Sequence, residues 1–347
     1  MRKALFGAAV SAVAIAAPAQ ADVPSVAVDI SPVHSLVAKV MDGVGSPNLI
    51  VQAGATPHGY SLRPAEAEAM QNADVIFWVS DDLAPWIQES INSLAGDARS
   101  VELFESAGVT RLHYREGPIF DGHGHDDAGH EKSGDNDQTE AAHSHDHDHA
   151  HDGDHAQDGD GHDHAEDGHG HHHAHSGVNP HAWLDPHNAR VWLDVIADVL
   201  GDMDPEHAQA YADNAAEAKA ELTRLSADID SAIAPVRGTN YIVFHDAYQY
   251  FEHRFDIPAA GAIRLGDASE PSPARIEELR DLVAELDVAC VFAEPQFNRG
   301  MVEAVFEQTQ AGIGVLDPLG SSLEPGPDMY PQLLRNLSDS LTTCLKK

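Results

Sequence analysis

Histidine is the residue whose placement in this chain points to chemistry. Sixteen histidines lie between His123 and His175, interleaved with Asp, Glu and Gly. Neutral imidazole is the commonest protein ligand for divalent transition metals. A segment this polar cannot bury a core, so we expect a disordered tract that binds metal weakly at several places, without one selective site. The candidate ligands in the tract are His143, His145, His147, His149, His151, His171, His172 and His173.

Three of the eight histidines outside the tract stand where ligands usually bind in α/β proteins. His58 lies in a loop after an apolar strand, His181 lies in a loop before a helix, and His245 ends another apolar strand. Ligands in open α/β sheets bind beyond the carboxyl ends of the strands. Asp317 ends a further predicted strand and could supply an oxygen, although capping the turn that follows is an alternative role for it.

The elements that position these residues follow from hydrophobic spacing. Short apolar runs alternate with helical patterns on both sides of the tract, which predicts parallel sheets with helices on both faces. Because the pattern occurs twice, we expect two α/β lobes. The predicted strands are 26–30, 49–53, 75–79, 101–104, 241–244, 259–263, 290–294 and 314–317. The predicted helices are 33–44, 63–72, 84–94, 247–254, 273–286, 301–310 and 330–345.

An uninterrupted apolar stripe predicts one long helix between the lobes, over residues 204–236. Asp204 is the predicted N-cap and Pro205 the first helical residue, and Pro235 ends the stripe. A helix of some thirty residues is about 45 Å long. If it joins the lobes, it links them as a stiff rod and makes large hinge closure difficult.

The first residues have the pattern of a secretory signal. Arg2 and Lys3 precede an apolar run too short to span a bilayer, and Ala19-Gln20-Ala21 offers a small-x-small cleavage site. We therefore expect an exported chain in a bacterial periplasm. The predicted organisation is a signal peptide (1–21), an N-terminal lobe (22–120 and 177–203), a His- and Asp-rich loop (121–176), a linker helix (204–236) and a C-terminal lobe (237–347).

Charge and cysteine content narrow the possible partners. The net charge of −37 argues against binding nucleic acid or anionic lipid. Cys290 and Cys344 are the two cysteines, and in an oxidising compartment a disulfide is the default expectation. The spacing alone does not show that the two residues approach each other.

Five segments, in this order and spacing, resemble the zinc-binding periplasmic proteins of ABC-type zinc uptake systems (the ZnuA family), within the cluster A-I solute-binding proteins. The resemblance covers essentially the whole chain after the signal. It lies in Pro57-His-Gly-Tyr-Ser-Leu-Arg-Pro64, Asn179-Pro-His-Ala-Trp-Leu-Asp-Pro186, Phe244-His-Asp-Ala-Tyr-Gln-Tyr-Phe251, Cys290-Val-Phe-Ala-Glu-Pro-Gln-Phe297 and Leu316-Asp-Pro-Leu319.

The resemblance implies a metal ion between two lobes joined by a long helix, held by His58, His181 and His245. It also implies that the two cysteines form a disulfide between the last helix and a strand of the C-terminal lobe. Manganese-binding relatives usually have a glutamate at the third position, so the histidine there favours Zn²⁺. Some zinc-binding members have a glutamate before the first histidine, where this chain has Pro57, so the fourth ligand is Asp317 or water.

The predicted function is capture of Zn²⁺ in the periplasm by a non-enzymatic, monomeric protein that delivers the ion to an inner-membrane ABC permease. The tract would collect or sense metal at low affinity, and other periplasmic zinc chaperones are possible partners. One alternative is a metal-storage protein that works through the tract. Another is a tri-histidine zinc hydrolase, although the sequence offers no His-Glu-x-x-His or Ser/His/Asp arrangement. Nickel, copper, cobalt and cadmium stay open as competing ions.

Overall fold

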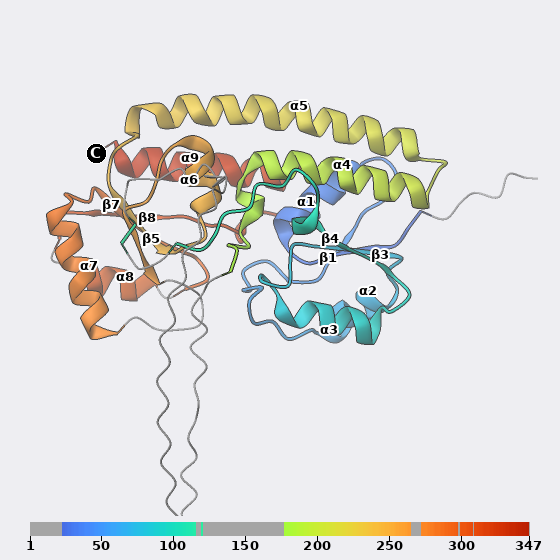
Figure 1. The fold of residues 1–347 in the computed structure, drawn as a ribbon, viewed down its shortest axis with the longest axis horizontal. Helices are drawn as coiled ribbons and strands as arrows, with labels where there is room; N and C mark the ends of the chain where they lie inside the picture. The colour runs from blue at the N-terminus through green and yellow to red at the C-terminus, as the bar shows by residue number, and fades with distance from the viewer. Residues whose placement is uncertain are drawn as a thin grey trace, which may run out of the picture. The chain divides into compact units, whose positions relative to one another are not determined.

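Two parallel four-stranded sheets form the frame of the protein, in a computed structural model that describes residues 23–115, 119–120, 177–264, 272–297, 299–307 and 309–346 (Figure 1). The first sheet has the order β2-β1-β3-β4 and the second has the order β6-β5-β7-β8. The strands of the first sheet are β1 (Val26–Val28), β2 (Asn48–Leu49), β3 (Val75–Trp78) and β4 (Arg99–Glu102). Those of the second are β5 (Tyr241–His245), β6 (Gly261–Arg264), β7 (Cys290–Ala293) and β8 (Gly312–Val315). The prediction of two α/β lobes is confirmed.

Helices bury both faces of each sheet. In the N-terminal lobe they are α1 (Ser31–Val40), α2 (Pro64–Gln71), α3 (Pro85–Leu94) and α4 (Pro186–Met203). In the C-terminal lobe they are α6 (Gln249–Phe255), α7 (Pro273–Glu285), α8 (Arg299–Phe306) and α9 (Met329–Leu345). Successive strand residues point to opposite faces: Ile76 packs in a cluster with α2 and α3, whereas Phe77 faces the centre of the molecule. Likewise Phe244 packs with α7 and α8, whereas Val243 faces inward.

The inward faces of both sheets share one hydrophobic core. Phe77 of β3, Trp192 of α4, Leu222 of the central helix, Leu334 of α9 and Phe292 of β7 all belong to the same buried cluster. Hydrogen bonds also cross between the lobes. The Ser35 hydroxyl on α1 donates to the Pro327 carbonyl (3.2 Å) and accepts from the Tyr330 backbone N–H (2.9 Å). The lobes are therefore joined by packing as well as by the chain.

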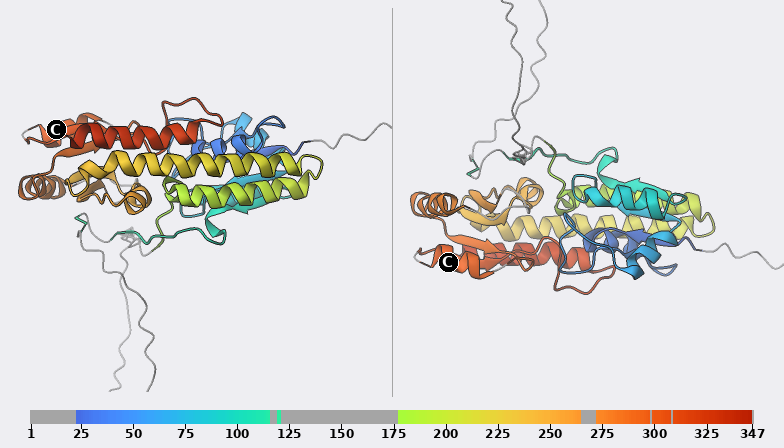
Figure 2. Two further views of the ribbon diagram at one scale, coloured as in Figure 1. Left: turned by 90° about the horizontal axis from the view of Figure 1, so that it is seen from above. Right: turned by 90° about the horizontal axis from the view of Figure 1, so that it is seen from below.

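The long helix α5 (Ala208–Ile233) runs along both lobes and lies between α4 and α9 (Figure 2). Its 26 residues correspond to about 39 Å. The predicted start was wrong. Asp204 is the C-cap of α4, directly after Met203. Its carboxylate accepts from the Tyr211 hydroxyl (2.9 Å) and pairs with the His207 ring (2.7 Å) across the turn to α5. Asp and Pro fit such a turn as well as they fit a helix start.

Several predicted strand boundaries shift. β2 is shorter than expected, β4 begins two residues earlier and runs into a 3₁₀ turn (Leu103–Glu105), and β8 ends at Val315. Asp317 therefore lies two residues beyond its strand, in the following turn. The expected signal peptide (1–21) and the histidine-rich loop (121–176) lie outside the described residues. Among the described helices, none combines the length and apolar character needed to cross a membrane.

The predicted disulfide is confirmed. Cys290 opens β7 and Cys344 lies near the end of α9, with their Cα atoms 6.1 Å apart. The bond fastens the last helix to the C-terminal sheet beside Gly312, where a Cβ atom would come within 3.2 Å of the Cys344 sulfur.

The chain on either side of the histidine-rich loop is anchored close to His181. His113 and Val178 form an antiparallel bridge, and the Tyr114 N–H donates to the Gly177 carbonyl (3.2 Å). Arg115 forms ion pairs with two carboxylates of the C-terminal lobe, Asp246 and Glu252, both buried. The described segments on either side of the loop are thus held next to each other.

Candidate metal centre

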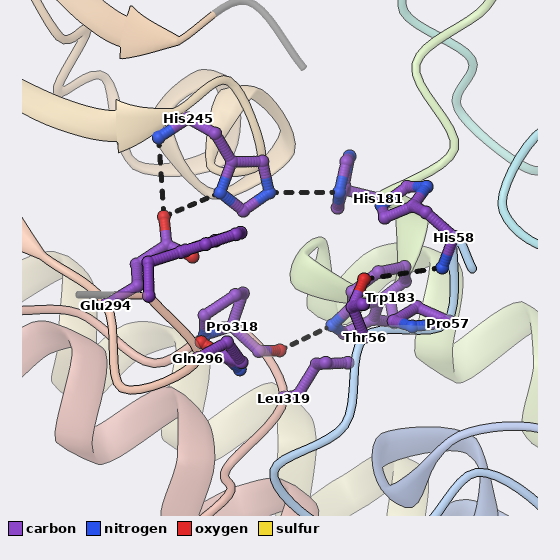
Figure 3. Close-up of a pocket in the computed structure, with 11 residues that line it drawn as sticks. Thr56, Pro57, His58, His181, Trp183, His245, Glu294, Gln296, Pro318 and Leu319 are labelled. Carbon is purple, nitrogen blue, oxygen red and sulfur yellow. Dashed lines mark hydrogen bonds and ion pairs between the residues drawn. The ribbon is translucent and has the colours of Figure 1, made fainter. Parts of the chain in front are cut away.

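His58, His181 and His245 come from different parts of the two lobes and line one pocket (Figure 3). His58 lies in the loop after β2, which is held by the Trp86 indole donating to the Pro57 carbonyl (2.8 Å). His181 precedes a 3₁₀ turn that leads into α4, and His245 is the last residue of β5. The pocket is lined by Thr56, Pro57, His58, His181, Trp183, His245, Glu294, Gln296, Phe297, Pro318 and Leu319.

The three imidazoles lie in a row with His181 in the middle (Figure 3). Its ring centroid is 5.4 Å from that of His58 and 5.3 Å from that of His245. The Nε2 atoms of His181 and His245 face each other at 3.4 Å. Residues separated by up to 187 positions in the sequence therefore meet where the lobes join.

A buried carboxylate orients His245. Glu294 follows β7, is 2% exposed, and places Oε1 2.6 Å from His245 Nδ1. The same oxygen accepts from the backbone N–H of His245 (3.4 Å). When Glu294 is ionised it can only accept hydrogen bonds, so Nδ1 then carries the hydrogen and Nε2 presents its lone pair to the pocket.

His181 is held in a similar way by a neutral side chain. Its Nδ1 lies 2.7 Å from Asn179 Oδ1, and its ring packs 5.2 Å from that of Trp183. Burial, together with the nearby His245 and His58, lowers the pKa of His181 well below its ordinary value near 6.5. His181 is therefore neutral at physiological pH, which is the form that binds metals.

The remaining walls are mostly apolar and connect the two lobes. The Trp183 indole donates to the Pro318 carbonyl (2.8 Å), and Phe297 stacks on Phe244 with centroids 4.5 Å apart. Apolar walls exclude water, which strengthens electrostatic interactions inside the pocket.

Asp317 does not line this pocket. Its carboxylate accepts from the Leu319 N–H (3.2 Å), the Ser321 N–H (2.7 Å) and the Ser321 hydroxyl (2.7 Å). The Gln296 amide reaches it at 3.4 Å. This is the turn-capping role that the sequence left as an alternative.

As the side chains stand, no group of three or more His, Cys, Asp or Glu residues in the described part of the chain is arranged to hold a metal ion. The pair formed by His181 and His245 is at ligand spacing, and His58 is the neighbouring imidazole. The eight candidate histidines of the tract lie outside the described residues.

In the sequence, Glu294 is one of two residues, with Arg264, that could orient a ligand histidine, and a structural salt bridge or cap is its alternative role; Asn179 is not singled out. Asn179 lies two residues before His181 and is fully buried. A buried asparagine or carboxylate close to a candidate ligand is the signal that would identify such residues. From sequence alone, however, neither burial nor proximity was available for Glu294, which comes from a different strand.

Comparison with known proteins places the chain. The family model described as the periplasmic zinc-uptake complex component A, ZnuA, matches residues 26–344. The chain belongs to the ZnuA family. Among its relatives, the high-affinity zinc uptake system protein ZnuA of Brucella suis is 44% identical over 322 residues, which cover 93% of this chain and 92% of the relative. The protein of the same name from Paracoccus denitrificans is 38% identical, covering 95% and 94%.

Solved structures share the ZnuA fold. A crystal structure of ZnuA superimposes with a TM-score of 0.69 at 20% identity, covering 93% of this chain and all of the other. A zinc-bound ZnuA mutant lacking residues 138–173 gives a TM-score of 0.68 at 20% identity, covering 93% and 98%. This family consists of solute-binding components of transport systems, which is a class distinct from enzymes.

Proposed function

We propose that this chain captures one Zn²⁺ ion in the pocket between the lobes and delivers it to an inner-membrane ABC permease. His58, His181 and His245 are the proposed ligands. The family and the names of the relatives support zinc uptake in the periplasm. The chain itself supplies the donor set, because imidazole nitrogens suit zinc better than they suit manganese.

One observation carries the proposal: the 3.4 Å separation of the Nε2 atoms of His181 and His245. Two nitrogens bound to a tetrahedral zinc at about 2.0–2.1 Å stand about 3.3 Å apart. The pair is therefore already spaced as two ligands of one tetrahedral ion. His58 adds the third nitrogen when its ring turns toward the point between the pair.

For the fourth position we propose water. Asp317 is held by three hydrogen bonds in its turn, so binding metal directly would cost those bonds. Because Asp317 is then not a ligand, replacing it with Asn is expected to change the zinc Kd less than about threefold. Loss of a carboxylate ligand would weaken zinc binding much more. A hundredfold weaker Kd in this variant would show that Asp317 is a ligand.

The histidine-rich loop is proposed as a low-affinity collector or sensor. The described residues that flank the loop are anchored beside His181, which would tether ions held by the loop near the pocket. We further propose that the protein acts as a monomer, and that other periplasmic zinc chaperones can supply it with metal.

Calorimetric titration with Zn²⁺, with Mn²⁺ as a competitor, tests the proposal. The full chain is expected to show one tight site and several weak ones, and deletion of residues 121–175 is expected to remove only the weak ones. His245→Ala is expected to abolish the tight site. A storage protein that works through the loop would scarcely respond to His245→Ala, and that result would overturn the proposed function.

A further inference from the structure

We infer that Asn179 is a positioning residue for metal binding: it fixes the tautomer of His181 and ties this ligand to the chain beside His245. The inference rests on the proposed function, because it takes His181 and His245 as ligands of the captured ion. It concerns which nitrogen of His181 has a lone pair free of hydrogen, and so can bind the metal ion, before the ion arrives.

The orientation of the Asn179 amide is settled by backbone partners. Its Oδ1 lies 3.1 Å from the backbone N–H of His181, which can only donate. Its Nδ2 lies 3.0 Å from the backbone carbonyl of Asp246, which can only accept. The amide therefore has one possible assignment, with the oxygen toward His181 and the nitrogen toward Asp246.

That assignment determines the hydrogen on the His181 ring. Oδ1 is also 2.7 Å from His181 Nδ1, and an amide oxygen can only accept. Nδ1 therefore carries the hydrogen, and neutral His181 presents the lone pair of Nε2 to the pocket. In the other tautomer, Nε2 would donate to Nε2 of His245, 3.4 Å away, and this bond would have to break before a metal could bind.

Both facing nitrogens are thus acceptors, because Glu294 imposes the same tautomer on His245. A cation placed between these two nitrogens would be bound by both lone pairs. The two histidines are in this way prepared for a metal ion rather than for each other.

Asn179 is itself immobilised. It is fully buried, its backbone N–H donates to the Leu112 carbonyl (2.8 Å), and its carbonyl accepts from the Tyr250 hydroxyl (2.7 Å). Its Nδ2 also donates to Gln249 Oε1 (3.0 Å) on α6. Since the Asp246 carbonyl and α6 directly follow His245, Asn179 couples the positions of two ligands that come from different lobes.

The test uses three variants of the full chain, with the His181 ring signals assigned by comparison with His181→Gln. Asn179→Ala removes both the oxygen that accepts from His181 and the amide that donates to the Asp246 carbonyl. Asn179→Asp keeps the oxygen toward His181 and loses the amide donor. Gln249→Ala removes one partner of Asn179 without touching His181, and so controls for a merely structural role. Imidazole ¹⁵N–¹H NMR of the metal-free protein reports the tautomer, and competition with a chelator reports the zinc Kd.

We expect Asn179→Ala to populate the Nε2–H tautomer of His181 and to weaken zinc binding by roughly 10- to 100-fold, the usual effect of losing a partner of a metal-binding histidine. Asn179→Asp and Gln249→Ala should keep the Nδ1–H tautomer. The inference is overturned if Asn179→Ala keeps that tautomer or binds zinc as tightly as the wild type. If Asn179→Ala does not fold, loss of the Nδ1–H tautomer in Asn179→Asp overturns it.

Failure of this inference can be distinguished from failure of the proposed function. If wild type and His245→Ala bind zinc equally, the proposed function fails, whatever the NMR shows. If His245→Ala loses the tight site and Asn179→Ala does not, only the inference about Asn179 fails.

Discussion

Replacing Glu294 tests whether the buried carboxylate behind His245 raises the zinc affinity. Glu294 accepts from His245 Nδ1 at 2.6 Å, and it is 2% exposed, so solvent does not screen the interaction. A hydrogen bond to a charged partner contributes roughly 1.5–3 kcal/mol, and a neutral one contributes about 1 kcal/mol. Glutamine keeps an oxygen acceptor but no charge, so Glu294→Gln should lose about 1 kcal/mol, or roughly fivefold in zinc Kd.

Glu294→Ala removes the acceptor and leaves the His245 N–H without this partner. The expected loss is about 2–3 kcal/mol, or roughly 30- to 150-fold in Kd. The assay is competition with a fluorescent zinc chelator at neutral pH, with thermal melts to confirm folding. Gln296→Ala is the matched control, because Gln296 lines the same pocket but reaches Asp317 rather than a histidine. The reasoning is refuted if Glu294→Ala stays within threefold of the wild type or if the control loses as much.

Three further predictions concern stability. The disulfide between Cys290 and Cys344 closes a loop of 54 residues, so replacing both with Ala should lower the unfolding free energy by about 4 kcal/mol. The zinc Kd should stay unchanged. An unaltered urea midpoint would contradict this prediction. Arg115→Ala leaves two buried carboxylates without their ion-pair partner and should cost about 3–5 kcal/mol in urea unfolding. Arg99→Ala, at the exposed pair with Asp202, should cost much less, and equal losses would disprove the prediction. Burial raises the pKa of Asp29 from 3.8 to about 7, so between these pH values the folded state binds a proton that the unfolded state does not. The unfolding free energy should therefore fall as pH rises from about 4 to about 7, by up to about 4 kcal/mol. Asp29→Asn should flatten this pH dependence, and an unchanged slope would refute the prediction.

Hydrophobic spacing predicted the fold well, because strands that are buried on both faces are unbroken apolar runs. The run at Val75–Trp78 is of this kind, and its alternate residues pack on opposite faces of the sheet. Local cap signals were less reliable. Asp204 has the residue type of a helix N-cap, but the end of α4 uses it, and no local pattern shows where one helix stops and the next begins.

The candidate site was predicted in part. His245 could be placed at a strand end from its own neighbours, but its meeting with His58 and His181 came from the family resemblance. Glu294 and Asn179 act through hydrogen bonds made by tertiary packing, so local spacing does not reveal them. Asp317 was placed at the end of its strand because the apolar run extends to Leu316, although β8 ends at Val315.

The shared inner core has a consequence for how the molecule comes apart. The cluster that covers the inward face of each sheet includes residues from the opposite half and from α5, whereas each outward face packs only with residues of its own half. We therefore expect the halves to unfold together in one cooperative transition, and neither half to fold when it is expressed alone. On this expectation, a destabilising substitution in one half lowers the unfolding free energy of the whole molecule.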